Sequence, residues 1–177
     1  MWTRSSYVNC IFDYVMPTRH DDLKIPISVL VLIHNRNREV LLIERADRPD
    51  FWQSVTGSLD EAYESLESAA IREVAEETGI DVFSLPSGSL QNLNYHTDYE
   101  IYPSWRHRYP PGVVRNTEHW FALEVPVDIP IRLAPREHLN YIWLPYQEAA
   151  EKCFSHTNRA AILWFYEKQD PSCSKKT

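Results

Sequence analysis

The chain has 177 residues, enough for one domain with a substantial hydrophobic core. Its 44% hydrophobic and 24% charged residues are typical of a soluble globular protein. The net charge of −7 argues against general affinity for nucleic acid or anionic membranes, although a metal ion or a few arginines could still hold a small anionic substrate.

Cysteine usage and the lack of membrane-directing segments predict a cytoplasmic protein. Cys10, Cys153 and Cys173 are odd in number and form no C-x-x-C pair, so we expect neither a disulfide framework nor a zinc site. No apolar run approaches the roughly 18 residues that a membrane helix needs. Residues 1–20 also lack the basic start and apolar stretch of a signal peptide.

In chain order, the pattern predicts an extension of uncertain structure at 1–20, one domain at 21–170 and a tail at 171–177. Apolar and β-branched segments predict strands at Ile25–Ile33, Val40–Ile43, Phe51–Thr56, Asp81–Leu85, Leu90–Tyr102, Thr117–Val125 and Tyr141–Leu144. Good helix formers predict helices at Glu64–Thr78, Tyr146–Lys152 and Asn158–Lys168. Residues 103–116 are expected to be a loop. This order of elements predicts an α/β or α+β sandwich.

The predicted helix at Glu64–Thr78 carries three carboxylates on the side that should face inward. At about 100° per residue, Glu73 and Glu77 fall on the apolar stripe and Glu76 lies beside them. That stripe consists of Leu66, Ala69, Ala70 and Val74. Repulsion between the carboxylates, the helix dipole and burial all disfavour this arrangement. A divalent cation would remove all three penalties, and an all-oxygen donor set suits Mg²⁺ or Mn²⁺ rather than zinc.

Glutamate-rich helix faces are more often solvated than functional, so the neighbouring residues decide between the two interpretations. Here an Arg-Glu pair, a glycine after the helix and a glycine-led loop before it complete a longer pattern. The segment resembles the Nudix box, G-x5-E-x7-R-E-U-x-E-E-x-G-U with U apolar, through Gly57, Glu64 and Arg72-Glu73-Val74-Ala75-Glu76-Glu77-Thr78-Gly79-Ile80. One departure is that six residues, not five, separate Gly57 from Glu64, and Ala62-Tyr63 stand where a second glycine is common.

The resemblance implies a Nudix-type α/β/α sandwich with a mixed sheet, in which a loop–helix–loop motif carries a metal-dependent hydrolytic site. The residues that it implies are catalytic are Glu64, Arg72, Glu73, Glu76, Glu77 and Glu137. Among them, Glu64 and Arg72 would brace the loop against the helix. The metal ligands would be Glu73, Glu76, Glu77 and Glu137, holding Mg²⁺ or alternatively Mn²⁺. Both Glu76 and Glu137 are candidates for the general base.

Residues 51–58, 106–118 and 137–144 resemble a bacterial subfamily that hydrolyses dihydroneopterin triphosphate to the monophosphate and pyrophosphate. This resemblance extends over roughly 24–165. It implies a small-molecule triphosphate partner, with substrate contacts at Lys24, Arg45, Thr56, Tyr99, Glu100, Ile101, Tyr102 and Ser155. The cationic residues suit phosphates, and the tyrosines suit stacking on a pterin or purine ring. The alternatives are a hydrolase of dATP or another (d)NTP, and a nucleotide-binding module without catalysis.

Several other side chains allow a structural interpretation. The basic residues Arg106, His107, Arg108 and Arg115 could equally bind phosphates or form structural ion pairs. The side chains that we expect to serve in packing are His119, Trp120, Trp143, Cys153 and Trp164.

Overall fold

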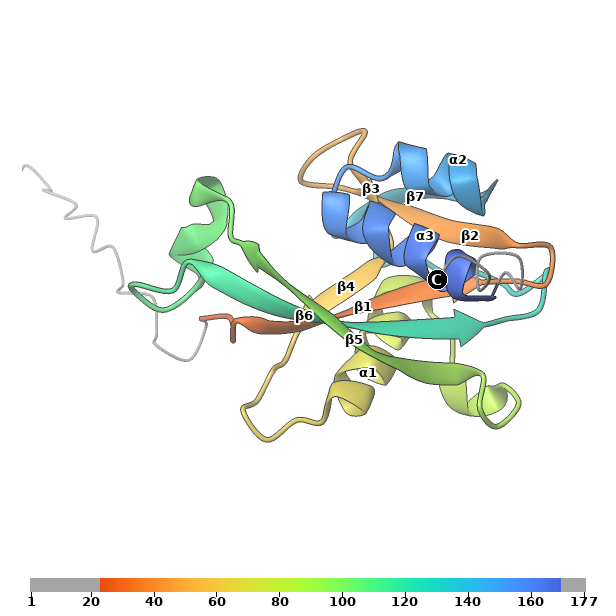
Figure 1. The fold of residues 1–177 in the computed structure, drawn as a ribbon, viewed down its shortest axis with the longest axis horizontal. Helices are drawn as coiled ribbons and strands as arrows, with labels where there is room; N and C mark the ends of the chain where they lie inside the picture. Colours follow the sequence, from red (N-terminus) through yellow and green to blue (C-terminus); the bar gives the residue numbers. More distant parts are fainter. Residues whose placement is uncertain (1–22, 170–177) are drawn as a thin grey trace, which may run out of the picture.

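The computed structural model describes residues 23–169, in which seven strands form one mixed sheet (Figure 1). The strands are β1 (Ile27–His34), β2 (Glu39–Arg45), β3 (Trp52–Gln53), β4 (Val55–Ser58), β5 (Leu90–Glu100), β6 (Arg115–Glu124) and β7 (His138–Pro145). The helices are α1 (Leu66–Thr78), α2 (Tyr146–Lys152), α3 (His156–Gln169) and the 3-10 helices η2 (Val82–Ser84) and η3 (Pro103–Arg108). The predicted extension at 1–20 and tail at 171–177 lie outside the described residues.

Strand pairing divides the sheet into two parts that meet at the end of β1 and the start of β2. These two strands pair antiparallel with His34 opposite Val40. Earlier on the same edge, β1 pairs antiparallel with β4. Along its whole length β1 pairs in parallel with β6, and β6 in turn pairs with β5. Strand β2 pairs with β3 and β7. The single parallel pair among antiparallel ones makes the sheet mixed, as predicted.

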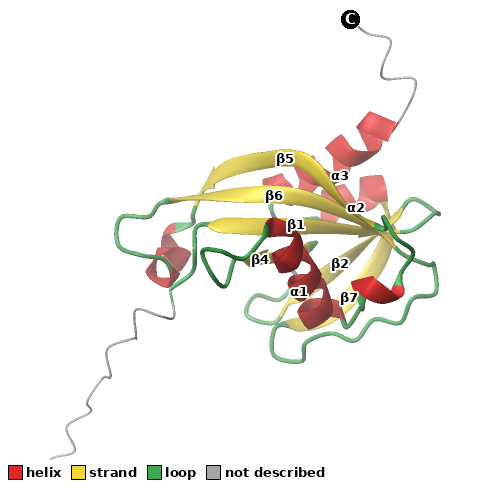
Figure 2. Ribbon diagram, turned by 90° about the horizontal axis from the view of Figure 1, so that it is seen from below, coloured by secondary structure: helices red, strands yellow, loops and turns green. Residues whose placement is uncertain are grey.

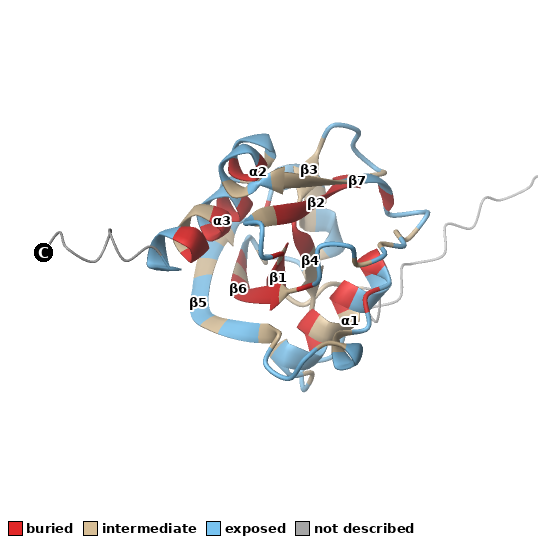
Figure 3. Ribbon diagram, turned by 90° about the vertical axis from the view of Figure 1, so that its right-hand side faces the viewer, coloured by how far each residue is buried: buried red, intermediate tan, exposed pale blue. Residues whose placement is uncertain are grey.

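Helices cover both faces of the sheet, with α1 on one side and α2 and α3 on the other (Figure 2). Alternation along β1 serves both layers, because successive side chains of a strand point to opposite faces. Val29 and Val31 pack in the cluster that includes Val74 of α1, whereas Leu30 packs with Ala161 of α3. The central strands are accordingly buried, as Figure 3 shows. The α/β/α sandwich is confirmed.

Helix α1 has well-formed caps at both ends. The Ser65 hydroxyl accepts a hydrogen bond from the Ser68 amide at 3.0 Å, so the helix begins at Leu66 and the predicted start at Glu64 was two residues early. Gly79 ends the helix in a left-handed conformation with φ of 70°. The predicted inward face is confirmed for Glu73 and Glu77, and the buried residues of the helix are Ala69, Ala70, Glu73, Val74, Glu77 and Thr78. Glu76, the third carboxylate expected on this side, is exposed instead.

Two other element predictions were wrong. The expected strand at Asp81–Leu85 is the 3-10 helix η2, because the Asp81 carboxylate accepts from the Phe83 amide at 3.0 Å and caps a turn. The expected loop at 103–116 contains η3 and the first residues of β6.

The expected single strand at Phe51–Thr56 is divided into β3 and β4, which pair with different partners. Between them the Ser54 amide donates to Asn158 Oδ1 at 2.7 Å, a contact from a distant helix that residue pattern alone does not reveal.

The predicted packing residues are half-buried or buried. Trp120 is buried, and His119 is half-buried. Trp143, Cys153 and Trp164 are half-buried against the core clusters. Within residues 23–169, none of the helices combines the length and apolarity needed to cross a membrane.

Candidate active site

Two adjoining cavities lie at the end of the sheet where α1, β4 and the turn before α3 meet. The aromatic pocket, of about 470 Å³, includes Phe51, Trp52, Tyr99, Tyr102, Trp105, Tyr109 and Phe154. The acidic pocket, of about 440 Å³, includes Glu73, Glu76, Glu77, Glu137 and His138. Residues that line both cavities are Lys24, Arg45, Thr56, Gly57 and Arg108, and we call the three cations among them the cationic wall.

The centre of the acidic pocket is Glu77, which is only 4% exposed. Its Oε1 lies 3.1 Å from Nε2 of His138, the buried first residue of β7. Its Oε2 accepts a hydrogen bond from the Thr56 amide at 3.3 Å. Elements distant in sequence therefore hold this carboxylate in one position.

Glu73 lies against the backbone of β4 at Gly57. A Cβ atom at Gly57 would stand 1.7 Å from Glu73 Oε1, so a side chain there would occupy the place of the carboxylate. Arg72 Nη1 donates to the same oxygen at 2.7 Å. The glycine that opens the sequence motif thus makes room for a carboxylate of its helix.

The electrostatics of this pocket favour a bound cation. Burial raises the pKa of Glu73 to about 7; the hydrogen bond from Arg72 opposes this effect and the nearby charge of Glu77 adds to it. Burial also raises the pKa of Glu77. One ligand atom from each of Glu77, Glu137 and His138 lies within 4.8 Å of the others. Two carboxylates and an imidazole at this spacing fit a divalent metal ion.

Arg72 and Glu64 connect α1 to the loop before it. Arg72 Nε and Nη2 donate to the two oxygens of Glu64 at 3.0 and 3.2 Å, and Nη2 also donates to the Ser58 carbonyl at 2.9 Å. Glu64 lines neither cavity. Ala62 and Tyr63, where the loop departs from the motif, are exposed to solvent. The longer loop therefore extends outward and leaves these contacts in place.

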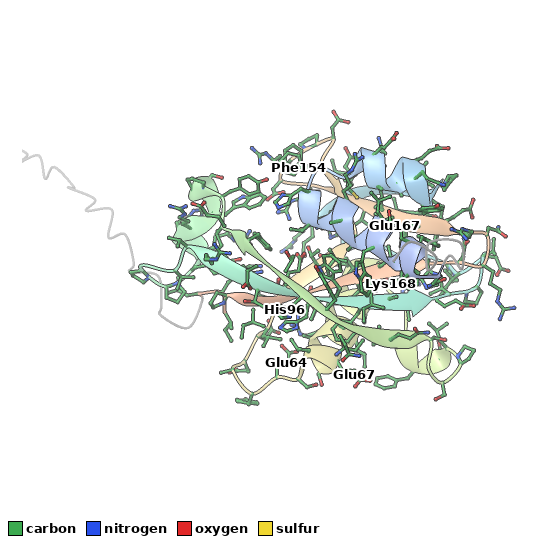
Figure 4. All side chains as sticks on the ribbon, in the orientation of Figure 1. Glu64, Glu67, His96, Phe154, Glu167 and Lys168 are labelled. Atoms are coloured by element: carbon green, nitrogen blue, oxygen red, sulfur yellow. The ribbon has the colours of Figure 1, made fainter. Side chains whose placement is uncertain are left out.

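The aromatic pocket is built from rings on three separate segments. Phe51 stacks on Phe154 with ring centroids 3.6 Å apart, and Tyr102 lies 6.1 Å from Phe154. Phe154 belongs to the turn between α2 and α3 and reaches toward the segment that joins β2 to β3 (Figure 4). Trp105 of η3 meets Tyr102 edge to face at 5.4 Å. Such rings suit stacking on a flat heterocycle.

The cationic wall separates these rings from the carboxylates. Burial lowers the pKa of Lys24, and the charge of Arg108 lowers it further. Arg45 is held by Asp47 through hydrogen bonds of 2.8 and 2.7 Å. Positive charge crowded at the junction of two cavities suits a polyanion that passes from one to the other.

Two roles are open from the sequence for the basic residues at 106–108 and 115, phosphate binding and structural ion pairs, and the structure divides the residues between them. Arg108 and Arg115 line the aromatic pocket, whereas Arg106 forms an ion pair with Glu100. His107 is exposed and lines neither cavity.

The structure brings most of the predicted site residues to the two cavities. Arg72 and the four predicted metal ligands line the acidic pocket. Predicted substrate residues that line the aromatic pocket are Lys24, Arg45, Thr56, Tyr99, Glu100, Tyr102 and Ser155. Ile101 is buried and lines neither cavity. Sequence reasoning missed His138, for which the only signal was its position next to Glu137.

Comparisons with known proteins agree with this geometry. The chain matches the model of the NUDIX domain over residues 24–165. It is 46% identical over 143 residues to dihydroneopterin triphosphate diphosphatase of Escherichia coli (strain K12), which covers 80% of this chain and 93% of the relative. It is 40% identical over 137 residues to the Haemophilus influenzae protein of the same name, covering 76% and 84% respectively.

A solved structure leads to the same family. The fold is similar to that of the E. coli dihydroneopterin triphosphate pyrophosphohydrolase, with a TM-score of 0.74 and 45% identity over 81% of this chain and 96% of that one. The match to the domain model spans most of the chain and includes both cavities. This protein therefore belongs to the Nudix hydrolase family.

Proposed function

We propose that the protein is a metal-dependent pyrophosphohydrolase that converts dihydroneopterin triphosphate to dihydroneopterin monophosphate and pyrophosphate. The observation that carries this proposal is the junction of the two cavities: carboxylates on one side, aromatic rings on the other and three cations between them. A triphosphate lying along the cationic wall places its ring in the aromatic pocket and its phosphates against α1. The names of the E. coli and H. influenzae relatives support the same substrate.

The metal ligands that we propose are Glu73, Glu76, Glu77 and Glu137, with Mg²⁺ as the ion and Mn²⁺ as the alternative. When bound, the ion neutralises diphosphate oxygens and lowers the pKa of a water molecule. His138 lies against Glu77, with Nε2 3.1 Å from Oε1, and Arg72 donates a hydrogen bond to Glu73. These contacts prepare the carboxylates before the ion arrives, which reduces the cost of ordering them.

For the general base, the candidates are Glu76 and Glu137. Both are exposed residues that line the acidic pocket, so either can take a proton from attacking water. The side chain of Glu76 is 58% exposed, and it also accepts a hydrogen bond from Arg72 at 3.3 Å.

We propose three roles for the residues that line the aromatic pocket and form the cationic wall. The cationic wall binds the phosphates, and the two hydrogen bonds to Asp47 hold Arg45 in position at that wall. The aromatic side chains of Phe51, Tyr102 and Phe154 offer ring faces on which the heterocycle can stack. Ser155 and Thr56 supply hydroxyl groups at the pocket walls.

The test of this function is a side-by-side measurement of kcat/KM for dihydroneopterin triphosphate and dATP with Mg²⁺ present. We expect the pterin substrate to give the higher value, and a higher value for dATP would replace the proposed substrate with a nucleotide. Hydrolysis in oxygen-18 water identifies which phosphorus is attacked. A cytoplasmic location, which rests on cysteine usage in the sequence, stays a prediction.

A further inference from the structure

A buried glutamate occupies the floor of the aromatic pocket. Glu118 lies on the face of β6 that α3 covers, because it is two residues before Trp120, which packs with Leu30 and Ala161. Ser28 of β1 lies opposite Glu118 in register, and both residues line the pocket. On this face of β1 and β6, Leu30 and Trp120 belong to the core beneath α3. Two residues earlier on the same strands, Ser28 and Glu118 line the aromatic pocket with polar groups.

One oxygen of the Glu118 carboxylate lacks a hydrogen-bond partner among the described residues. The residue is 3% exposed, and its Oε1 has no hydrogen-bond partner within the described part of the chain. Burial raises its pKa to about 7, and the polar side chains of Thr157 and Trp120 offset this only in part. A buried carboxylate oxygen without a partner is costly, so such an oxygen in a cavity indicates that a ligand completes it.

The chemistry of that ligand follows from the position of the carboxylate relative to the cations. The cationic wall lies at the junction with the acidic pocket, so a triphosphate bound there directs its ring toward the aromatic side chains. Two adjacent carboxylate oxygens pair best with two parallel N–H donors. A 2-amino-4-oxo ring, as in a pterin, presents such donors on its ring nitrogen and its amino group. Adenine offers one donor beside an acceptor.

We propose that Glu118 determines substrate specificity by accepting two hydrogen bonds from the ring N–H and the amino group of a 2-amino-4-oxo heterocycle. This inference rests on the proposed function and deepens it, because it names the group that separates a pterin triphosphate from dATP. It also explains why a charged residue stands where the strand pattern would allow an apolar one.

The test is Glu118→Gln, assayed at pH 8 with Mg²⁺ on dihydroneopterin triphosphate and on dATP. The glutamine amide keeps one hydrogen-bond acceptor, but its NH2 group faces the second N–H of the pterin, donor against donor. The same amide matches adenine, whose edge offers one donor and one acceptor. We expect the ratio of kcat/KM for the pterin substrate to that for dATP to fall roughly 100-fold or more. Glu118→Asp, which keeps the carboxylate, should retain the pterin preference with a higher KM.

The matched control is Glu124→Gln, the same change on the same strand. The Glu124 carboxylate pairs with Arg36 at 3.1 Å and lines neither cavity, so the ratio should not change. An unchanged ratio in a folded Glu118→Gln protein, or an equal loss on both substrates, would overturn this inference alone. If Glu118→Gln does not fold, loss of the pterin preference in Glu118→Asp would overturn it. A wild-type protein that releases no pyrophosphate from dihydroneopterin triphosphate would instead overturn the proposed function.

Discussion

The acidic and aromatic pockets differ in how the chain assembles them. Six of the fourteen residues that line the acidic pocket lie in one stretch, Gly57 to Glu77, including three of its glutamates, and Glu137 and His138 add to them from the start of β7. The aromatic pocket draws on residues near 24–28, 98–118 and 154–158 together with the segment around Phe51. Three of the four proposed metal ligands therefore lie within one turn of a helix, whereas the proposed substrate contacts depend on tertiary structure.

The strongest test of the acidic pocket is Glu77→Gln. Loss of a buried carboxylate that we place on the metal should lower kcat for Mg²⁺-dependent pyrophosphate release by roughly 1,000-fold. Glu67→Gln, an exposed change in the first turn of the same helix, is the control and should retain activity. A Glu77→Gln protein that hydrolyses any triphosphate at the full rate would show that the site is misplaced.

In the aromatic pocket, stability should reveal Glu118 independently of catalysis. Its folded pKa of about 7 is above the ordinary value of 4.5, so the unfolded chain ionises first as pH rises. Wild-type stability is therefore lost between pH 4.5 and pH 7 by about 3 kcal/mol, at about 1.4 kcal/mol per pKa unit. Urea unfolding at pH 5 and pH 8 should show Glu118→Gln gaining stability over wild type at the higher pH. If the difference in unfolding free energy between Glu118→Gln and wild type is the same at pH 5 and pH 8, this explanation is wrong.

Two glycines, Gly57 in β4 and Gly79 at the end of α1, should separate effects on activity from effects on stability. Gly57→Ala pushes the flexible end of Glu73 aside, and we expect kcat to fall roughly 10- to 100-fold with little change in melting temperature. Gly79→Ala forces a side chain into a φ of 70° and places its Cβ 3.0 Å from Cβ of Arg132, so it should cost about 2 kcal/mol of stability and leave the carboxylates in place. The reverse pattern would mean that Gly57 serves the fold rather than the site.

The cationic wall can be tested with two neighbouring arginines. Arg108→Met removes a charge shared by both cavities and should raise KM for the triphosphate about 10-fold, at about 1.4 kcal/mol per tenfold change. Arg106→Met removes a guanidinium that lines neither cavity, although its partner Glu100 lines the aromatic pocket, and it should leave KM near the wild-type value. Equal effects on KM would assign the basic cluster to structure rather than to phosphate binding.

Sequence reasoning succeeded where the relevant interactions are local. The periodicity of α1 was sufficient to place Glu73 and Glu77 on its buried face, since side chains three and four residues apart lie on one side of a helix. It failed at the 3-10 helix η2, because one Asp81 side chain overrides the apolar character of the segment. It also missed the division of Phe51–Thr56 into two strands, which depends on Asn158.

The same distinction applies to the candidate site. His138 carries no spacing that predicts a ligand, and only the approach of β7 to α1 brings it within 3.1 Å of Glu77. Glu118 is one polar residue in an alternating strand, so its importance depends on the cavity that the α2–α3 turn and β5 enclose. Sequence spacing cannot report on contacts of this kind.

The parallel pairing of β1 with β6 also has a kinetic consequence. It brings together segments such as Ser28 and Asn116, which hydrogen-bond at 2.6 Å although 88 positions separate them. Closing such a long loop is slow, whereas α1 can form from local contacts. The floor of the aromatic pocket should therefore be among the last parts of the molecule to form. A ligand that binds this floor should slow unfolding more than it accelerates folding. The reason is that the floor has not yet formed in the transition state for folding, so the ligand stabilises mainly the native state.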